Sequence, residues 1–414
     1  MLSRHLKNAR IIYVLLAVAI LVGGAYTTWR THNSSTDFDT YFFAAKRILD
    51  NQPLYQEIDG LSPYIYPPFF ACALTPFALI GLLPAAFLWY LFNIALILFS
   101  IRVVSSLVFD KTGMIKGLDG IKFIPKAIVV GITAAIFLDN LSLLQVNILI
   151  FAAVLAGIYL LSKKMALSAA AAFAFAISVK VIPAVFVLYY LVKRQFRVAA
   201  LITIFVVIFS ALVPILALGS GNASEAFGWW RSENFEKSAG NTPSFQMMDT
   251  MFNPENQSLT AILSRWMVKN DGNVIYWKKI SHEYPVFLHN INLGLEAPVA
   301  IYMGKALTLG IVIITLFACA GRARRQTTGL ANYEHSLIML TALLTTPILK
   351  SQHFTLVIFP LFAALHWGPK ILIIFLFLYA SQAVRIFEIA GLGGLSVVFL
   401  WAVFLLKYMK SKYM

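Results

Sequence analysis

The sequence predicts an all-α polytopic membrane protein, a bundle of about 12 transmembrane helices with outer-face loops that carry short helices. Of its 414 residues, 60% are hydrophobic and only 12% are charged, whereas soluble proteins carry about 25% charged residues. Apolar runs recur along the whole chain, and short basic clusters separate them. Together these observations favour many membrane spans over one large soluble core.

The basic residues fix the predicted orientation. The net charge of +15 lies mostly in short loops, as the positive-inside rule expects of cytoplasmic loops, and this disfavours a nucleic-acid-binding surface. Six clusters mark the cytoplasmic side: 4–10, 111–126, 163–164, 193–197, 321–325 and 407–414. One arrangement with both termini inside satisfies all six, with spans at 11–28, 84–106, 123–139, 144–162, 166–179, 181–193, 198–218, 299–319, 334–348, 353–367, 370–387 and 391–408.

The first apolar run is interpreted as an uncleaved signal-anchor, because no A-x-A-like cleavage site follows it. A cleaved signal peptide is the alternative. The two cysteines, Cys72 and Cys319, fall on opposite sides of the predicted membrane, so no disulfide is expected. No internal repeat is visible, and we expect one domain over 1–414.

The apolar stretch 66–82 is predicted not to span, because counting it as a span would move every later basic loop to the outer side. It is expected to lie on the outer surface or to re-enter the membrane. Four polar segments then share the outer face: the loop 29–83, the corner 139–140, the long loop 219–298 and the corner 349–353.

Two acids, Asp37 and Asp39, begin an amphipathic stretch in which apolar residues recur at helical spacing. The pattern predicts a short helix on the membrane surface with Asp37 near its N-terminus. An aspartate there can cap the helix or serve catalysis, and local sequence leaves both open. Residues two apart do not face each other on a helix, so at most one of the two acids points into a given site.

Cations on the outer side form a second unusual feature. Lys180, Lys350 and Arg385 lie at membrane depth, beside His353 in the late corner. Such groups line a wet cavity with a partner, or they only snorkel to the interface. As a group they indicate a cavity for a phosphate or diphosphate. His282 and His289 lack a carboxylate at metal-ligand spacing and are interpreted as structural, and no nucleotide-binding loop, H-E-x-x-H or G-x-S-x-G motif occurs.

Several segments, taken in order, resemble glycosyltransferase family 87, polytopic enzymes of the clan C glycosyltransferase fold typified by polyprenyl-phosphate-mannose-dependent mannosyltransferases. The segments are "DFDTYFFAAKRILDNQPLY", "YIYPPFFACALTPFALI", "LLQVNILIFAAVL", "AISVKVIPAVFVLYYLVKRQFR", "NQSLTAIL" and "TPILKSQHFTLVIFPL". They cover most of the chain up to about residue 365. Their order and spacing carry the resemblance more than any single motif does.

The resemblance implies a catalytic aspartate at Asp37 and a functional histidine at His353, although family members often carry two histidines or Trp-His where this chain has Gln352 and Phe354. It also implies a role for Lys180 near the donor phosphate, and we assign Lys350 and Arg385 to the same phosphate. The remaining predicted substrate-binding residues are Asp39, Tyr41, Tyr66, Gln145, Asn147, Asn256 and Gln257. No cofactor and no metal site are expected.

The predicted activity is transfer of a sugar, with mannose favoured, from a polyprenyl-phosphate donor to a lipid or glycan acceptor hydroxyl. Asp37 would act as the base and the anomeric centre would be inverted. The predicted location is the bacterial plasma membrane, with the site on the periplasmic or extracellular face and with membrane lipids but no nucleic acid as partners. A flippase or transporter of a lipid-linked or anionic substrate is the alternative, although carriers favour two related halves that this chain does not show.

Overall fold

The computed structural model describes residues 2–34, 36–56, 63–109, 118, 120–236, 253–268, 275–279, 282–286, 294–321, 328–367, 369–383, 388 and 390–413. Its first helices are α1 (Leu2–Ser34), α2 (Asp37–Leu49), α3 (Pro68–Ala78), α4 (Leu82–Phe109), α6 (Phe123–Leu143), α7 (Asn147–Ser162) and α8 (Ala166–Val179). The central helices are η1 (Ile182–Ala184), α9 (Val185–Val192), α10 (Phe196–Val207), η2 (Ile208–Leu212), α11 (Val213–Leu218), α12 (Ser220–Arg231), η3 (Ser232–Glu236) and α15 (Leu259–Met267). The last helices are α16 (Ala297–Cys319), α17 (Thr328–Leu344), η4 (Ser351–Val357), α18 (Ile358–Ala363), η5 (Leu365–Trp367), α19 (Pro369–Ala380), η6 (Ser381–Ala383) and α21 (Leu392–Tyr413).

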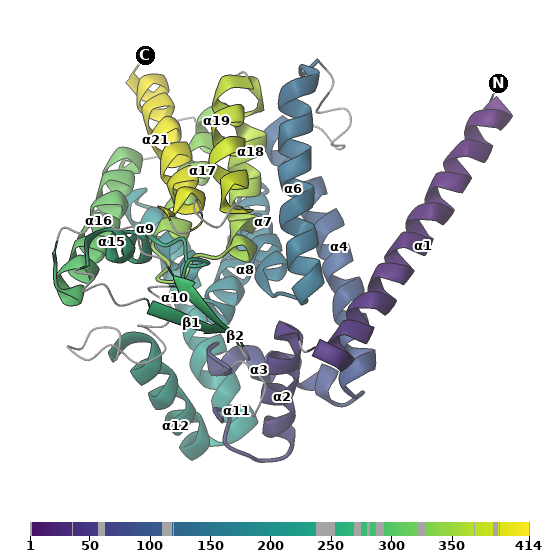
Figure 1. Ribbon diagram of the computed structural model, residues 1–414, viewed down its shortest axis with the longest axis vertical. Coiled ribbons are helices and arrows are strands. Elements are labelled where there is room, and N and C mark those ends of the chain that lie inside the picture. The colour runs from purple at the N-terminus through teal and green to yellow at the C-terminus, as the bar shows by residue number, and fades with distance from the viewer. Residues whose placement is uncertain are drawn as a thin grey trace.

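The helices form a bundle with two distinct ends (Figure 1). The C-terminus of α21 lies at one end, which we call the C-terminal end, and α2, α3 and α12 gather at the other, which we call the α2–α3 end. The predicted spans overlap helices over most of their described length, although 144–146 and 345–348 are not helical. Among the described residues, five helical segments are long and apolar enough to cross a membrane: 82–109, 123–143, 196–218, 297–319 and 392–412. The apolar helices therefore fit a multi-pass membrane protein, and the full number of crossings stays a prediction.

Helix α3 accounts for the apolar stretch that the charge pattern excludes from the spans. It has 11 residues, and at about 1.5 Å per residue it is roughly half as long as the hydrocarbon core is thick. Its buried face packs on α2, and Phe69 stacks on Phe209 at 5.1 Å between ring centroids. An apolar helix of this length suits a surface-lying or re-entrant position.

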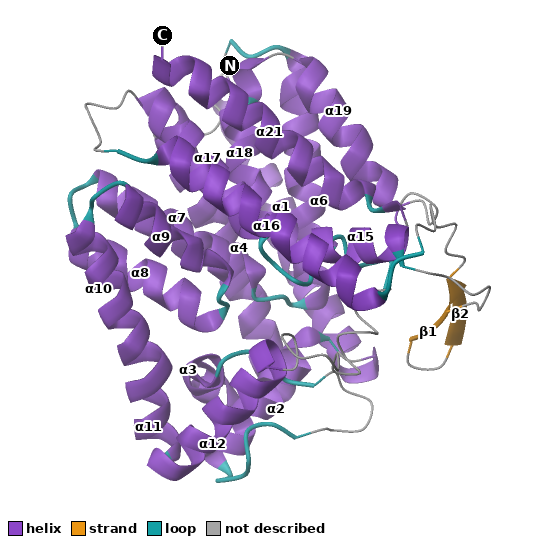
Figure 2. Ribbon diagram, turned by 90° about the vertical axis from the view of Figure 1, so that its left-hand side faces the viewer, coloured by secondary structure: helices purple, strands orange, loops and turns teal. Residues whose placement is uncertain are grey.

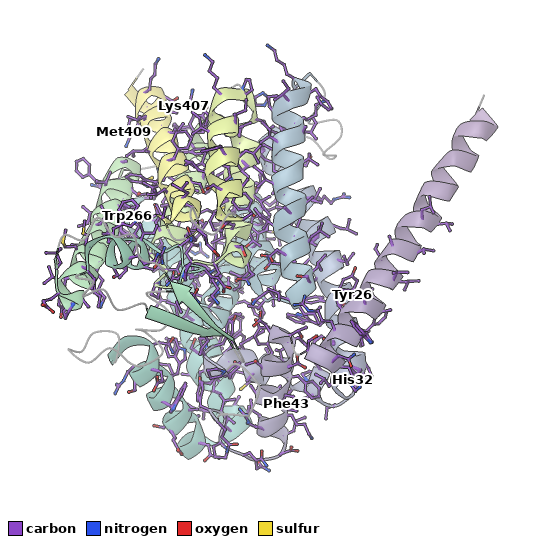
Figure 3. All side chains as sticks on the ribbon, viewed as in Figure 1. Tyr26, His32, Phe43, Trp266, Lys407 and Met409 are labelled. Carbon is purple, nitrogen blue, oxygen red and sulfur yellow. The ribbon has the colours of Figure 1, made fainter. Side chains whose placement is uncertain are left out.

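The N-terminal helix stands apart from the bundle over much of its length (Figures 1 and 3). Its contact with α4 lies near Gly23 and Gly24, where a Cβ added at Gly23 would meet the Tyr90 hydroxyl at 2.5 Å. Nearer its start, apolar side chains are exposed, among them Val14, Leu15, Val18, Leu21 and Val22. A helix with apolar residues on all sides is typical of a membrane-spanning segment, and the signal-anchor stays a prediction.

The long loop 219–298 contributes α12, α15 and a small hairpin. Strand β1 (Ile275–Lys279) pairs antiparallel with β2 (His282–Val286), with Ile275 opposite Val286. The hairpin projects from the helical body (Figure 2). These are the strands among the described residues, so the rest of the described fold is helical, as predicted.

Some predicted features lie outside the described residues. Arg385 and His289 are among them, together with half of the basic cluster 111–126 and most of the cluster 321–325.

Both cysteines, Cys72 and Cys319, are free and buried.

Candidate active site

The N-terminus of α2 separates the two acids that the sequence leaves as rivals. Thr36 is the N-cap, and the Asp39 carboxylate accepts the Thr36 backbone N–H through Oδ2 and the Thr36 hydroxyl at 3.2 Å. This is a capping box, in which the residue three positions into the helix satisfies the cap. Asp39 is 2% exposed, and its carboxylate bonds to the N-cap residue. Asp37, at the first helical position, is half-buried and turns to a different partner.

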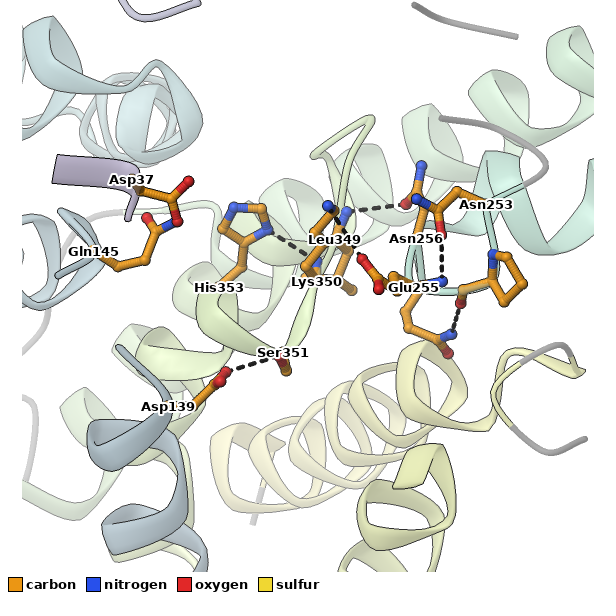
Figure 4. Close-up of polar contacts among 12 residues, drawn as sticks. Asp37, Asp139, Gln145, Asn253, Glu255, Asn256, Leu349, Lys350, Ser351 and His353 are labelled. Carbon is orange, nitrogen blue, oxygen red and sulfur yellow. Dashed lines mark hydrogen bonds and ion pairs between the residues drawn. The ribbon is translucent and has the colours of Figure 1, made fainter. Parts of the chain in front are cut away.

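That partner is Gln145, whose side-chain amide Nε2 donates to Asp37 Oδ2 (Figure 4). Gln145 follows Leu144, which has a φ of +53° in the left-handed region that bulky residues rarely adopt. The Trp89 indole donates to the Leu144 carbonyl at 2.9 Å, and the Gln145 backbone N–H donates to the Asn140 carbonyl at 2.9 Å. These bonds hold the corner between α6 and α7 in the shape that presents Gln145 to Asp37.

The orientation of the Gln145 amide is fixed by its other contacts. Its Oε1 accepts from the Tyr41 hydroxyl at 3.1 Å and from Asn147 Nδ2 at 3.3 Å. An oxygen that accepts two donors must be the carbonyl, so Nε2 is the atom that faces Asp37. The Tyr41 hydroxyl also lies 3.1 Å from that of Tyr66. Among the described residues, Asp37 Oδ1 has no hydrogen-bond partner.

Asn147 connects this group to the predicted cations. Its Oδ1 accepts from Lys180 Nζ at 3.1 Å, and Lys180 Nζ lies 2.7 Å from His353 Nε2. Lys180 ends α8, where Pro183 two residues into the next helix prevents a continuous helix. The structure therefore brings together seven predicted residues from five segments of the chain: Asp37, Tyr41, Tyr66, Gln145, Asn147, Lys180 and His353.

Lys350 precedes η4, and His353 is the third residue of that helix (Figure 4). The Lys350 backbone N–H donates to His353 Nδ1 at 3.0 Å, while Lys350 Nζ lies 3.4 Å from Glu255 Oε2. On the far side of His353, Ser351 donates its hydroxyl to Asp139 Oδ2 at 2.7 Å. Lys350 thus keeps a carboxylate neighbour, unlike Lys180.

Asn256 and Gln257 engage backbone groups with their side chains. Asn256 Oδ1 accepts the Leu349 N–H at 3.0 Å, and its Nδ2 donates to the Pro347 carbonyl at 3.1 Å. Gln257 donates to the Glu388 carbonyl at 2.9 Å and lies against Gly394, where an added Cβ would meet the Gln257 carbonyl oxygen at 2.0 Å. Both side chains are 1% exposed. The structure thus places these predicted substrate-binding residues where they hold the corner that carries Lys350.

Burial shapes the proton affinities of the site. Desolvation raises the pKa of the Asp37 carboxyl, and the Gln145 hydrogen bond, Lys350 and Lys180 oppose it. Burial lowers the pKa of Lys180 to about 7, against the attraction of Asp37. The site therefore holds a carboxylate of increased basicity near an amine that titrates close to neutral pH, a pairing typical of functional sites.

Aromatic rings line one side of the site. Tyr41, Tyr66 and Phe70 pack edge to face around Asp37's helix, and the Lys180 ammonium position lies 5.8 Å from the Tyr66 ring centroid. Farther out, Trp229 stacks on Tyr55 at 4.1 Å, so one face of that indole is covered by the chain itself. Behind Lys180 and His353 lies a small cavity lined mostly by apolar side chains of α7, η1, α17 and η4.

Within the described ranges, no three His, Cys, Asp or Glu side chains lie close enough together to hold a metal ion. Sequence reasoning did not assign roles to Trp89, Asn140, Ser351 or Glu255, each of which holds a site residue or its backbone. For Asn140, the cluster of Asn and Gln in "DNLSLLQVN" is a signal that could have found it, because buried amides need partners. Trp89, Ser351 and Glu255 have no comparable local signal.

The fold and the site define a helical membrane protein with a buried carboxylate, amide and cation cluster at one corner of its bundle. A family model for glycosyltransferase family 87 matches residues 64–347, well over half of the chain. The chain belongs to this family and is a membrane glycosyltransferase. The match includes Gln145, Asn147 and Lys180, whereas Asp37 lies well before its start and His353 lies shortly after its end. Searches of curated proteins and of solved structures found no match.

Proposed function

We propose that the protein transfers a sugar, with mannose favoured, from a polyprenyl-phosphate donor to a hydroxyl of a lipid or glycan acceptor, with inversion at the anomeric carbon. The single observation that carries this proposal is the hydrogen-bonded chain from Asp37 through Gln145 and Asn147 to Lys180 and His353. It holds a carboxylate at one end and the amine and imidazole nitrogens of Lys180 and His353 at the other, and glycosyl transfer from a phosphate needs a base and groups that bind the phosphate.

Asp37 serves as the general base. It is half-buried, so a substrate hydroxyl can reach it, and its raised pKa makes its carboxylate a stronger base than a solvated one. Gln145 binds Oδ2 and so orients the carboxylate with Oδ1 available for the acceptor hydroxyl. The deprotonated oxygen attacks the anomeric carbon from the face opposite the phosphate, and inversion follows with one carboxylate rather than the pair that glycosidases use.

Lys180 and Lys350 bind the phosphate of the donor, and Arg385 is proposed for the same role although it lies outside the described residues. Charge grows on this phosphate as the glycosidic bond breaks, and fixed cations that stabilise it supply the electrostatic part of catalysis. His353, in contact with Lys180, faces the same phosphate. A phosphate leaves as a stable anion, so no general acid is required.

We further propose that the α2–α3 end faces the outer side of a bacterial plasma membrane, with both termini in the cytoplasm. The basic clusters of the sequence support this orientation. The short apolar helix α3 lies beside the site and suits an interfacial position from which a polyprenyl chain can reach the cations. Substrate-binding roles are proposed for Tyr41 and Tyr66: the Tyr41 hydroxyl donates to Asp37's partner Gln145 and lies beside the Tyr66 hydroxyl.

Transfer is tested with the full-length protein in lipid nanodiscs, supplied with radiolabelled polyprenyl-phosphate mannose and a lipid extract of its host. Wild type is expected to move label into a new lipid or glycan. Asp37→Asn removes the base but keeps the shape, so turnover is expected to fall by about 10²–10⁴-fold while donor binding persists. Asp50→Asn, an exposed acid at the end of the same helix, is the matched control and is expected to transfer normally.

Asp39→Asn separates the rival assignments. If only this variant loses sugar transfer, the protein is still a glycosyltransferase and Asp39 is its base. If no sugar donor gives transfer while wild type moves lipid-linked sugar across the bilayer, the proposed reaction is wrong and the protein is a carrier.

A further inference from the structure

The hydrogen bonds of His353 determine where its proton lies. Its Nδ1 faces the Lys350 backbone N–H at 3.0 Å, and a backbone N–H can only donate. Nδ1 therefore presents a lone pair, and the single proton of the neutral imidazole is on Nε2. That Nε2–H points at Lys180 Nζ, 2.7 Å away.

This geometry sets the charge of Lys180. An ammonium group has three donors and no lone pair, so it cannot accept a hydrogen bond from Nε2–H. An uncharged amine can accept this bond and still donate to Asn147 Oδ1 at 3.1 Å. The Asn147 amide is itself fixed, because its Nδ2 donates to Gln145 Oε1 and to Asn140 Oδ1, each at 3.3 Å. The observed contacts are thus those of a neutral lysine.

The surroundings of Lys180 favour the same state. In the described part of the chain no carboxylate lies within ion-pair distance of it: Asp37 of α2 bonds to Gln145, Asp139 of α6 bonds to Ser351, and Glu255 pairs with Lys350. The Tyr66 ring lies 5.8 Å away, and the adjoining cavity is lined by Ile150, Ile182, Leu343 and Leu356 among others. Burial accordingly lowers the pKa of Lys180 to about 7.

We propose that Lys180 rests as an uncharged amine held by His353 and takes up one proton when the phosphate of the donor binds, so that donor binding and protonation are coupled. The inference rests on the proposed function, since it needs a phosphate in this site. The protonated amine then donates to the phosphate oxygens in place of accepting from His353. His353 keeps its Nε2–H, which becomes free to donate to the phosphate as well.

The charges balance across the reaction. The donor is a phosphodiester with one negative charge, and the proton gained by Lys180 offsets it on binding. In the transfer step the acceptor oxygen forms a bond to the anomeric carbon and the bond from that carbon to the phosphate oxygen breaks. The hydroxyl proton passes to Asp37, and the phosphate changes from one negative charge to two. The new ammonium therefore lies where this second charge develops.

Calorimetry measures the proton uptake directly. Farnesyl methyl phosphate, a diester whose own charge is constant, is titrated into the protein in nanodiscs in buffers of different ionisation enthalpy. Wild type is expected to take up about one proton per bound diester near pH 8.5 and almost none near pH 6, where Lys180 is already charged. Because the resting amine must be protonated first, diester affinity should fall about tenfold for each pH unit above about 7.

Variants assign the proton. Lys180→Arg carries a permanent charge and is expected to bind the diester with no uptake at any pH. Lys163→Arg, an exposed lysine at the end of α7, is the control and should behave as wild type. Uptake that persists in Lys180→Arg would overturn the assignment to Lys180.

Two failures are distinguishable. Binding of the diester by wild type without proton uptake would overturn this inference and leave the proposed transferase intact. Absence of binding together with absence of sugar transfer would remove the phosphate site and both proposals with it. The wild-type measurement alone decides between these outcomes, even if a variant does not fold.

Discussion

Two lysines, one buried and one half-buried, flank the same short helical segment and have opposite surroundings. Lys193, after α9, lies 2.9 Å from Glu334 Oε1, and Glu334 also accepts from the hydroxyls of Tyr189 at 2.7 Å and of Tyr408. Lys180, before η1, contacts only the uncharged groups Asn147 and His353 among the described residues. The fold pairs the Lys193 ammonium with a carboxylate, whereas among the described residues it gives Lys180 no carboxylate partner.

The difference separates a stabilising cluster from a reactive one. Glu334 is 0% exposed and links α9, α17 and α21 near the C-terminal end of the bundle. Its carboxylate accepts from an ammonium group and from two tyrosine hydroxyls. Such a cluster specifies helix packing. The Lys180 cluster is half-buried and lies beside Asp37, and among the described residues no carboxylate pairs with Lys180. Incomplete clusters of this kind are typical of binding and catalytic sites.

We expect the strongest change from a variant that removes the carboxylate of Glu334. Glu334→Gln leaves the Lys193 ammonium buried without its carboxylate, and loss of one partner of a buried pair costs about 3–5 kcal/mol. We expect a marked drop in the thermal unfolding midpoint of the protein in nanodiscs, followed by intrinsic fluorescence. Specific activity of the molecules that remain folded should change little, because this cluster is remote from the site.

The double variant Lys193→Met with Glu334→Leu is the control for that experiment. It removes both charges, and apolar replacements of a buried pair are often neutral or stabilising. Recovery of most of the lost stability is expected. A double variant as unstable as Glu334→Gln would mean that the tyrosine hydrogen bonds, not the ion pair, hold these helices together.

The reverse result is expected for the other lysine. Lys180→Met removes an amine that the fold does not neutralise, so the unfolding midpoint should stay near that of wild type. Loss of one preorganised donor to a developing negative charge typically costs about 10²–10³-fold in rate, and sugar transfer should fall by that factor. Turnover with labelled donor and the fluorescence midpoint are measured on the same preparation.

Exposed Lys163→Met is the matched control and should change neither quantity. If Lys180→Met instead unfolds the protein and the folded fraction transfers sugar normally, the contrast between the two lysines disappears. Lys180 would then be a structural residue like Lys193.

Hydropathy and charge predicted the helical framework because a bilayer imposes both. Most of the predicted spans overlap helices, and the stretch 66–82, which the parity of the basic loops predicts not to span, contains the short α3. Whether that stretch crosses the membrane stays a prediction. The hairpin β1–β2 within the long loop was not predicted. Local sequence in that loop carries no bilayer constraint, so its structure depends on contacts that composition does not encode.

The sequence predicted which types of residue form the site, but not which of them serve substrate and which hold the backbone. The corner at Leu144 depends on a left-handed backbone and on the distant Trp89 indole, neither of which has a local signature. Asn256 looks like a ligand-binding amide in sequence, yet it bonds to the backbone at Pro347 and Leu349. Amide side chains serve substrates and backbone equally well, and only the three-dimensional contacts distinguish the two uses.

A weaker change is expected for the two acids of α2. The Asp39 carboxylate is hydrogen-bonded within the N-cap, whereas Asp37 Oδ1 has no hydrogen-bond partner among the described residues. Asp39→Ala removes the carboxylate that caps Thr36 and should lower stability by about 1 kcal/mol. Asp39→Glu keeps a carboxylate at the third helical position, where Glu commonly completes a capping box, and should restore that stability. Both variants are expected to retain most of their sugar transfer, because Asp37 Oδ2 stays bonded to Gln145 whatever occupies position 39. If Asp39→Ala abolished transfer without changing the unfolding midpoint, the capped acid would be the reactive one. The geometry at Gln145 would then serve the position of α2 rather than the chemistry.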